Sequence, residues 1–437
     1  MARNMQAAGE MRRPITHAGA LIRGLVVAGV ALGFVGVAPG LAAAQEVPYT
    51  PPSATEAEGF FVEPDLITRA ALVVDRQLSK GDFANGFYWD FNQMIPGAGW
   101  ISGGPGYRHW YKGNKLFIDG SSSISWRRYK AVQGRVELPA LAHSRLALGT
   151  QVRWQDYSQI DYFGMGPASL ERDRTQYRLQ STHATGYATV RPARWMDITA
   201  EIGWLKPTVR APSGAFLRNL PSTSEVFAGS PVHARFDTPT FVPKELSITV
   251  DTRDFPSHPT RGVLLRGATA RYDDRDSGVF TFQRYETEAA GFLPIGGGRV
   301  VLALRGWAVS TETGANQLVP FYLQPSLGGA NTIRGYADYR FHDRNLLVVN
   351  AEARVALLTH LDFALFADAG NVAADRRDLD LARQSFGAGL RLHTRRITFA
   401  RLDAARGDEG WRMVFRLSEP LNLSRLSRRA AIAPFVP

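Results

Sequence analysis

The most constraining feature of the sequence is an alternation of apolar and polar side chains, with a period of two residues, along most of the chain. In NLLVVNAEARVALL, which spans residues 345–358, one face collects leucine, valine and alanine, while Asn350, Glu352 and Arg354 fall on the other. Side chains with this period belong to β-strands that have one apolar and one polar face. The same pattern recurs at residues 146–154, 197–204 and 361–370. The chain is therefore predicted to be all-β.

Alternation alone also fits a soluble β-sandwich, but three features favour a membrane barrel. The predicted strands reach about ten residues or more, and their polar faces keep charged and amide groups at mid-strand. Tryptophans stand near strand ends, as in an interfacial girdle; they are Trp154, Trp204, Trp307 and Trp411. In hydrocarbon every backbone group must be paired, so a sheet must close on itself. We predict a transmembrane antiparallel β-barrel of about 16 strands, since bacterial barrels are even-numbered.

The N-terminus has the order of a secretory signal peptide. Arg12 and Arg13 precede an apolar run at residues 25–38, and LAAAQ at residues 41–45 offers a small-residue cleavage site. The alternative is an uncleaved anchoring helix, but the apolar run is short for a membrane span. The expected division of the chain is a signal peptide at 1–44, a proline-rich leader with a short amphipathic helix at 45–85, the barrel at 86–420 and a basic tail at 421–437.

The composition excludes several classes of protein. There is no cysteine, so disulfides, thiolate metal sites and a lipidated N-terminus are impossible. The formal charge of +11 falls to +8 when four arginines and one glutamate leave with residues 1–44, and the remaining arginines are scattered singly, so no nucleic-acid partner is expected. The sequence contains neither G-x-S-x-G nor H-E-x-x-H, and its nine histidines are dispersed. We expect neither an enzyme nor a cofactor or metal site. Such motifs do not detect a catalytic triad whose residues lie far apart in the sequence.

Several short motifs stand together in one order along the chain. They are DYFGMGP at 161–167, DTRDFPSHPTRG at 251–262, LGGANTIRGY at 327–336, and FADAGNV at 366–372 followed by FGAGLRL at 386–392. In these motifs the sequence resembles the BamA/TamA-type outer-membrane assembly proteins of the bacterial surface antigen superfamily. The likeness runs from about Gly86 to Pro420.

The resemblance implies a role for the arginine of NTIRGYADYR. In the family this loop folds into the barrel lumen, and its arginine pairs with acids on the first and second strands after the loop, which here are Glu352 and Asp368. The alternation independently places both carboxylates on the polar face. A guanidinium binds carboxylates in a two-pronged geometry, so we expect Arg334 to latch the loop rather than to be solvated. Gly335 would let the backbone turn without a Cβ, and Tyr336 would wedge the loop against the wall.

The motif at 251–262 carries a second set of charged residues. We expect Asp251, Arg253, Asp254, Arg261 and Gly262 to form a strand end and a turn in which charges pair. This role is structural.

The chain departs from its relatives before the barrel. Assembly proteins of the family place periplasmic POTRA modules there, which receive clients or secretion partners. Between Gln45 and Gly86 only a short segment remains, with helical spacing at residues 63–81. We therefore expect a member without these modules.

The expected location is the outer membrane of a Gram-negative bacterium, and the expected function is assembly, insertion or translocation of outer-membrane proteins. The seam between first and last strands would pair with a client strand. The alternative is a pore for ions or small solutes; a barrel enzyme is less favoured. The expected partners are outer-membrane lipid, other barrel proteins and periplasmic chaperones, and the expected state is a monomer.

Overall fold

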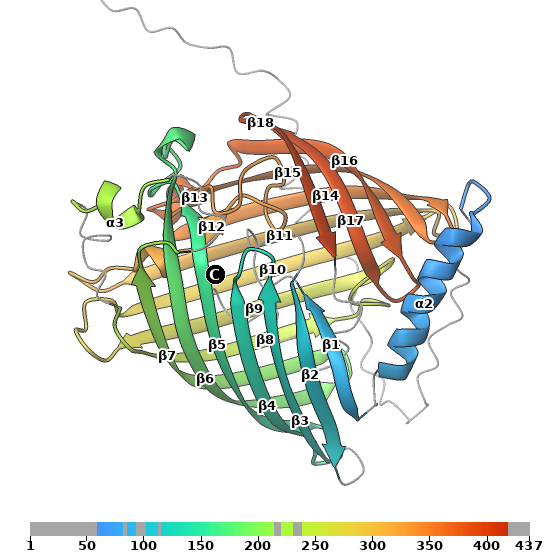
Figure 1. Cartoon of the computed structure of the whole chain (residues 1–437), viewed down its shortest axis with the longest axis horizontal. Helices are drawn as coiled ribbons and strands as arrows, with labels where there is room; N and C mark the ends of the chain where they lie inside the picture. The colour runs from blue at the N-terminus through green and yellow to red at the C-terminus, as the bar shows by residue number, and fades with distance from the viewer. Residues whose placement is uncertain are drawn as a thin grey trace, which may run out of the picture. The chain divides into compact units, whose positions relative to one another are not determined.

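A computed structural model describes residues 59–81, 85–92, 102–111, 115–213, 220–229 and 238–417. The predicted signal peptide and the basic tail lie outside these residues. All described residues belong to the compact unit Thr55–Pro437. Most of them form one sheet of sixteen strands in which every neighbouring pair is antiparallel. Figure 1 shows the strands following one another round a strongly curved sheet, from blue β1 to red β18.

The hydrogen-bonded order of the sheet follows the chain, with one interruption between β11 and β14. The sixteen strands are β1 (Gly86–Asn92), β2 (Ser102–Tyr111), β3 (Leu116–Ser125), β4 (Lys130–Leu141), β5 (Leu146–Tyr162), β6 (Thr175–Ala193), β7 (Met196–Arg210), β8 (Phe241–Asp251), β9 (Gly262–Asp274), β10 (Phe282–Ile295), β11 (Val300–Thr313), β14 (Asn345–Leu358), β15 (Leu361–Ala373), β16 (Arg383–His393), β17 (Thr398–Gly407) and β18 (Gly410–Leu417). A separate pair, β12 (Ser326–Leu327) with β13 (Phe341–His342), lies within the interruption. The expected count of about 16 strands is confirmed.

Because neighbouring strands are antiparallel, successive connections alternate between two edges of the sheet. We call one edge the short-turn end; it holds the connections β2–β3, β4–β5, β6–β7, β8–β9, β10–β11, β14–β15 and β16–β17. The other, the long-loop end, holds the connections β3–β4, β5–β6, β7–β8, β9–β10, β11–β14, β15–β16 and β17–β18. Short turns at one end and longer loops at the other are typical of outer-membrane barrels.

The two faces of the strands differ as the alternation predicts. On β15, Leu365 is 53% exposed, while its neighbours Ala364 and Phe366 are buried on the inner face. The prediction that the tryptophans belong to an interfacial girdle is wrong for Trp307. Trp204 and Trp411 are exposed on the outer face, but Trp307 lies on the inner face, where its ring nitrogen donates to Glu286 at 2.9 Å. The alternation of β11 itself, with Val309 buried two residues further on, explains this orientation.

The expected closure of the sheet is not seen among the described residues, where no hydrogen-bonded register joins β1 to β18. These two strands stand at the two ends of the described sheet. They have seven and eight residues, whereas the other fourteen have ten to nineteen.

The predicted helix is α2 (Asp65–Gly81), which follows Pro64. A second, four-residue helix, α3 (Thr223–Val226), lies in the β7–β8 connection. The segment before α2 is fixed at the short-turn end, because the amides of Phe60 and Phe61 donate to the carbonyls of Ala356 and Leu357 on β14. In the part of the chain that the structure describes, no helix is long and apolar enough to cross a membrane.

The apolar core lies between the inner face and the long β11–β14 loop. One cluster packs Phe321 and Tyr322 of the loop against Tyr162 of β5 and Tyr177 of β6. A second cluster packs the loop residues Leu327, Ile333, Tyr336 and Phe341 against Leu346, Val348 and Val372 of β14 and β15. The loop therefore folds onto the inner face, where it brings its polar residues to the wall.

Candidate functional site

The first candidate site is the contact of Arg334 with the wall formed by β14 and β15. Nε and Nη2 of Arg334 donate to the two carboxylate oxygens of Asp368, at 2.9 and 2.8 Å. Nη1 donates to Glu352 at 2.8 Å, and the backbone amide of Arg334 also donates to Asp368, at 3.1 Å. The fork of the guanidinium thus meets the first and second strands after the loop, and the two residues named from the sequence are its partners.

These three residues belong to a larger buried network that also includes β16 and β17. Glu352 accepts a second hydrogen bond from Arg391 at 3.0 Å, and Arg391 pairs with Asp403. Asp403 lies 3.9 Å from Arg334 and 3.9 Å from Arg401. The network holds three guanidinium groups and three carboxylates: Arg334, Arg391, Arg401, Glu352, Asp368 and Asp403. Its formal charges balance, which is the condition for burying ions in a protein interior.

The position of Arg334 is electrostatically well satisfied. Burial alone would lower the pKa of its guanidinium, but the hydrogen bonds and charges of Asp368 and Glu352 outweigh this effect, so the net shift of the pKa is upward. The guanidinium also stacks over the ring of Phe366, with 3.4 Å between its central carbon and the ring centroid. Arg334 therefore stays charged and fixed.

Gly335 and Tyr336 fix the loop by packing closely against the wall. A Cβ on Gly335 would lie 2.6 Å from Cβ of Ser385 and 2.7 Å from the amide nitrogen of Gly407. The glycine is needed for this close approach to β16 and β17 rather than for a left-handed turn, since its φ is not positive. Tyr336 is buried in the second apolar cluster, and its hydroxyl donates to Asp408 at 2.9 Å.

Arg340 is a second anchor of the loop, and the sequence did not predict it. Arg340 donates to Glu409 in the β17–β18 turn at 2.7 Å, and to the side chain and carbonyl of Ser169 in the β5–β6 loop at 3.0 and 2.8 Å. It therefore ties the loop to connections on distant parts of the sheet. Arg340 is the last residue of the segment NTIRGYADYR, but nothing in the spacing of that segment indicated these partners.

The second candidate set lies in the β8–β9 turn at the short-turn end. The guanidinium of Arg253 forks onto Asp251 through Nε and Nη2, both at 2.9 Å. Asp254 accepts from the amides of Phe255 and Thr260, so it orders the turn. Arg261 contributes its backbone amide at 3.4 Å, while its side chain is exposed.

Gly262 closes this turn with a positive φ of 102°. A Cβ there would lie 2.4 Å from the carbonyl oxygen of Thr252. Within this set Arg253 and Asp251 form the charge pair, whereas Asp254 accepts from backbone amides of the turn.

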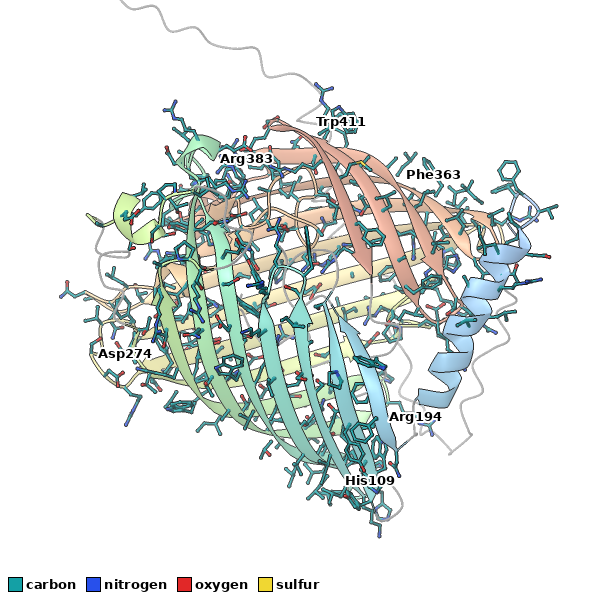
Figure 2. The ribbon with its side chains drawn as sticks, in the orientation of Figure 1. His109, Arg194, Asp274, Phe363, Arg383 and Trp411 are labelled. Carbon is teal, nitrogen blue, oxygen red and sulfur yellow. The ribbon has the colours of Figure 1, made fainter. Side chains whose placement is uncertain are left out.

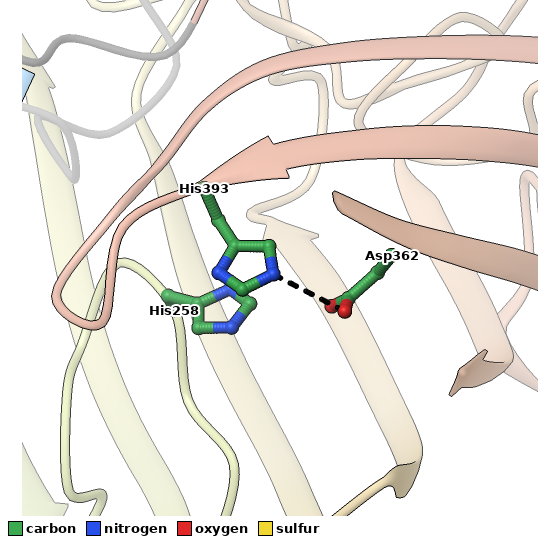
Figure 3. Close-up of side chains that lie close together, drawn as sticks. All are labelled: His258, Asp362 and His393. Carbon is green, nitrogen blue, oxygen red and sulfur yellow. Dashed lines mark hydrogen bonds and ion pairs between the residues drawn. The ribbon is translucent and has the colours of Figure 1, made fainter. Parts of the chain in front are cut away.

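A buried cluster next to this turn was not visible in the sequence. Figure 3 shows His258 of the turn beside His393 and Asp362. The two imidazole rings stack with centroids 4.0 Å apart, and Nε2 of His393 lies 3.2 Å from Asp362. Nδ1 of His258 meets the hydroxyl of Thr398 at 2.8 Å and lies 3.5 Å from the guanidinium of Arg354. The cluster joins the β8–β9 turn to the ends of β15, β16 and β17.

The same three side chains could be considered as metal ligands, because their nitrogen and oxygen atoms all lie within 4.8 Å of one another. Imidazole binds a metal through a lone pair that lies in the ring plane. The planes of His258 and His393 are only 10° from parallel, so their lone pairs do not converge on one point. Arg354 adds a positive charge beside the rings. The cluster is a contact between elements and does not have the geometry of a metal centre.

Comparisons with known proteins place this geometry in context. The family model for the Omp85 superfamily domain matches residues 137–408. Among solved structures, BamA from Haemophilus ducreyi lacking POTRA domains 1-3 has a TM-score of 0.56 at 16% identity, over 76% of this chain and 70% of that chain. CdiB from Acinetobacter baumannii gives 0.47 at 14% identity, and CdiB from Escherichia coli 0.48 at 15%, over 76% of this chain and 58% and 61% of theirs. No curated protein matches the sequence.

Proposed function

The chain belongs to the Omp85 superfamily, and from this premise we propose that it acts in the outer membrane of a Gram-negative bacterium in the assembly, insertion or translocation of other proteins. The proposal is supported by the match to the superfamily domain and by the order of the sheet, in which β1 and β18 stand at the two ends and share no register among the described residues. An edge strand presents a row of free N–H and C=O groups that can pair with an incoming strand. The clients are other barrel proteins, delivered by periplasmic chaperones, and the working unit is a monomer.

The Arg334 latch has a supporting role in this proposal. The buried charges fix the loop against β14 to β17, so that side of the sheet cannot separate when the seam opens. Arg334 is a positioning residue in this account, and Gly335, Tyr336, Glu352 and Asp368 serve the same latch. Templating by strand pairing breaks no covalent bond, and the mechanism involves no catalytic residue or cofactor.

The test uses introduced disulfides across the seam. Because the chain has no cysteine, a pair placed in β1 and β18 is the only thiol pair present. Suitable positions are the outward-facing Phe87, Trp89, Trp411 and Met413, in all cross-strand combinations. The control is Ala351→Cys with Ala367→Cys, which lie opposite each other in the β14–β15 pair.

The readout is the amount of other barrel proteins in the outer membrane of a deletion strain that carries each variant. We expect the deletion to lower these amounts and the wild-type protein to restore them. The seam pairs should restore them only when reduced, while the control should do so in both states. Full restoration by an oxidised, verified seam cross-link would refute templating at this edge.

Measurements of conductance distinguish the alternative, a pore for solutes, from the proposed function. The packing of the β11–β14 loop on the inner face supports a mostly closed channel in planar bilayers, with opening or noise after Arg334→Ala. Equal, steady and large conductance of both forms would favour the pore.

A further inference from the structure

The two ends of the sheet differ in charge. Among the described residues that connect strands at the short-turn end, Asp254 is the one carboxylate, and it is occupied by hydrogen bonds within its own turn. Connections at the long-loop end carry many acids, among them Glu171, Asp276, Asp375, Asp378, Asp408 and Glu409. In Figure 2, Arg194 and Asp274 mark the two opposite ends. The surplus of positive charge therefore gathers where the chain makes its short turns.

Exposed arginines recur from turn to turn at the short-turn end. They are Arg145 between β4 and β5, Arg194 between β6 and β7, Arg299 between β10 and β11, and Arg396 between β16 and β17. Within the described ranges none of the four pairs with a carboxylate. Arginines at the long-loop end often do: Arg340 pairs with Glu409 and Arg412 with Glu171. The short-turn arginines are thus free to bind an external anion.

An apolar segment is fixed at the same end. Phe60, Phe61 and Val62 are 56%, 67% and 96% exposed, although the two backbone hydrogen bonds to β14 hold them in place. A Cβ on Gly59 would lie 2.3 Å from the Cα of Leu358, so the chain approaches β14 as closely as glycine allows. Exposed phenylalanines on a fixed backbone are costly in water. They require an apolar environment outside the chain.

This segment continues the apolar outer face of the sheet. Leu293 and Ile295 at the end of β10 are 60% and 46% exposed, and Arg299 follows directly in the next turn. The guanidinium of Arg299 stands over the ring of Phe60, 5.5 Å from its centroid. Apolar side chains thus lie on the strand side and guanidinium groups on the turn side, which is the order of an acyl chain and its phosphate at a membrane surface.

We infer that the short-turn end binds anionic phospholipid of the leaflet that it faces, through the exposed arginines and the Phe60–Val62 segment. The inference rests on the membrane location in the proposed function. Guanidinium groups bind phosphate in two-pronged contacts, and basic groups at a membrane surface favour anionic lipid. Phe60 and Phe61 enter the boundary between headgroups and acyl chains, as aromatic residues of interfacial anchors do. Phosphatidylglycerol is a suitable probe because it has one phosphate monoanion and no cationic group.

The experiment measures which lipid stays with the full-length protein. The protein is refolded into vesicles of phosphatidylethanolamine and phosphatidylglycerol, its folding is checked by heat-modifiable migration, and the lipid retained after mild detergent extraction is quantified. The short-turn variant replaces Arg145, Arg194 and Arg299 by serine. The matched control replaces three exposed arginines of the long-loop end, namely Arg172, Arg210 and Arg275, by serine, so both variants lose the same charge.

We expect the wild-type protein and the control to retain phosphatidylglycerol above its share of the vesicle. The affinity of the short-turn variant for phosphatidylglycerol should fall by about a hundredfold, since each of the three basic groups near a surface contributes about fivefold, and the enrichment should disappear. Equal loss in both variants, or no enrichment in the wild type, would overturn the inference.

The apolar half is tested with Phe60→Ser combined with Phe61→Ser. We expect reduced retention of phosphatidylglycerol, with inorganic phosphate a poor competitor. If the double variant retains as much lipid as the wild type and phosphate competes fully, the site recognises phosphate alone and the lipid assignment is wrong. Failure to insert into vesicles, read from the folding check, would instead contradict the membrane location.

Discussion

The wall from β14 to β17 and the strands β1 and β18 at the two ends of the described sheet differ in how they are held. The wall is joined by long registers and by the buried charges around Arg334. The edges are short, and within the described chain they have no register to each other. The contrast indicates that the buried charges stabilise β14 to β17, up to the strand that pairs with β18, rather than the contact between β18 and β1.

Removing the central cation should weaken the wall most. Arg334→Met takes from Asp368 its guanidinium partner and leaves the buried network with one uncompensated negative charge, because Arg391 still pairs with Glu352 and Asp403. Breaking such a buried pair costs about 3–5 kcal/mol. We expect this loss in the free energy of unfolding, measured with urea on the refolded protein in detergent. Arg275→Met, at an exposed loop arginine, is the control and should change the free energy by less than about 0.5 kcal/mol. Similar values for the two variants would show that the latch contributes nothing to stability.

A methyl group at the loop contact should have the next largest effect. Gly335→Ala pushes a Cβ into Ser385 and the backbone of Gly407, and overpacking of this kind costs about 1–3 kcal/mol. Gly306→Ala on β11 is the matched control, since an added Cβ meets no atom within 4 Å there. Proteolysis of the β11–β14 loop should become faster in the first variant only.

Acid should loosen the β8–β9 turn by a smaller amount. Burial, then the charges of His393 and Arg354, lower the pKa of His258 well below 6.5, so it stays neutral in the folded protein. In the unfolded chain it binds a proton as the pH falls below 6.5, so the stability that it contributes is full above that value and declines below it. One proton changes the free energy by at most about 1.4 kcal/mol per pH unit.

The measurement for this prediction is the pH dependence of urea unfolding between pH 7.5 and 5 for the wild-type protein and for His258→Gln. Asp362, Arg354 and the hydroxyl of Thr398 also face the ring pair and remain in the variant. The variant should show a flatter dependence. Identical curves would mean that His258 is not the titrating group.

The smallest effect is expected from one hydroxyl. Tyr336→Phe removes the hydrogen bond to Asp408, which costs about 1 kcal/mol. Burial, with Asp408 beside it, raises the pKa of Tyr336 to about 12, so the hydroxyl remains a donor at neutral pH. Tyr285→Phe on the exposed outer face serves as the control in the same unfolding measurement. A loss equal to that of the control would place Tyr336 outside the latch.

Local periodicity was enough to predict the strands and the faces of β14 and β15, because each strand repeats its own pattern. The partners of Arg334 followed from a family likeness combined with that periodicity. The contacts that Arg391 and Asp403 make in the same network were not predicted. Both residues lie on other strands, and only the register of the sheet brings them to the same depth.

Contacts between distant segments could not be predicted. His258 and His393 meet because the β8–β9 turn folds back onto the ends of β15, β16 and β17, and no spacing in the sequence encodes that path. The sequence also predicted a closed sheet, because closure was inferred from the needs of a sheet in hydrocarbon; among the described residues no register joins β1 to β18.

The most direct test is hydrogen–deuterium exchange of backbone amides in the full-length protein in lipid nanodiscs. The open-edge account predicts that amides of β1 and β18 exchange rapidly, while those of β14 and β15 remain protected for far longer. Slow exchange of both edges, equal to that of the β14–β15 pair, would mean that the seam is zipped in the membrane and would contradict the account.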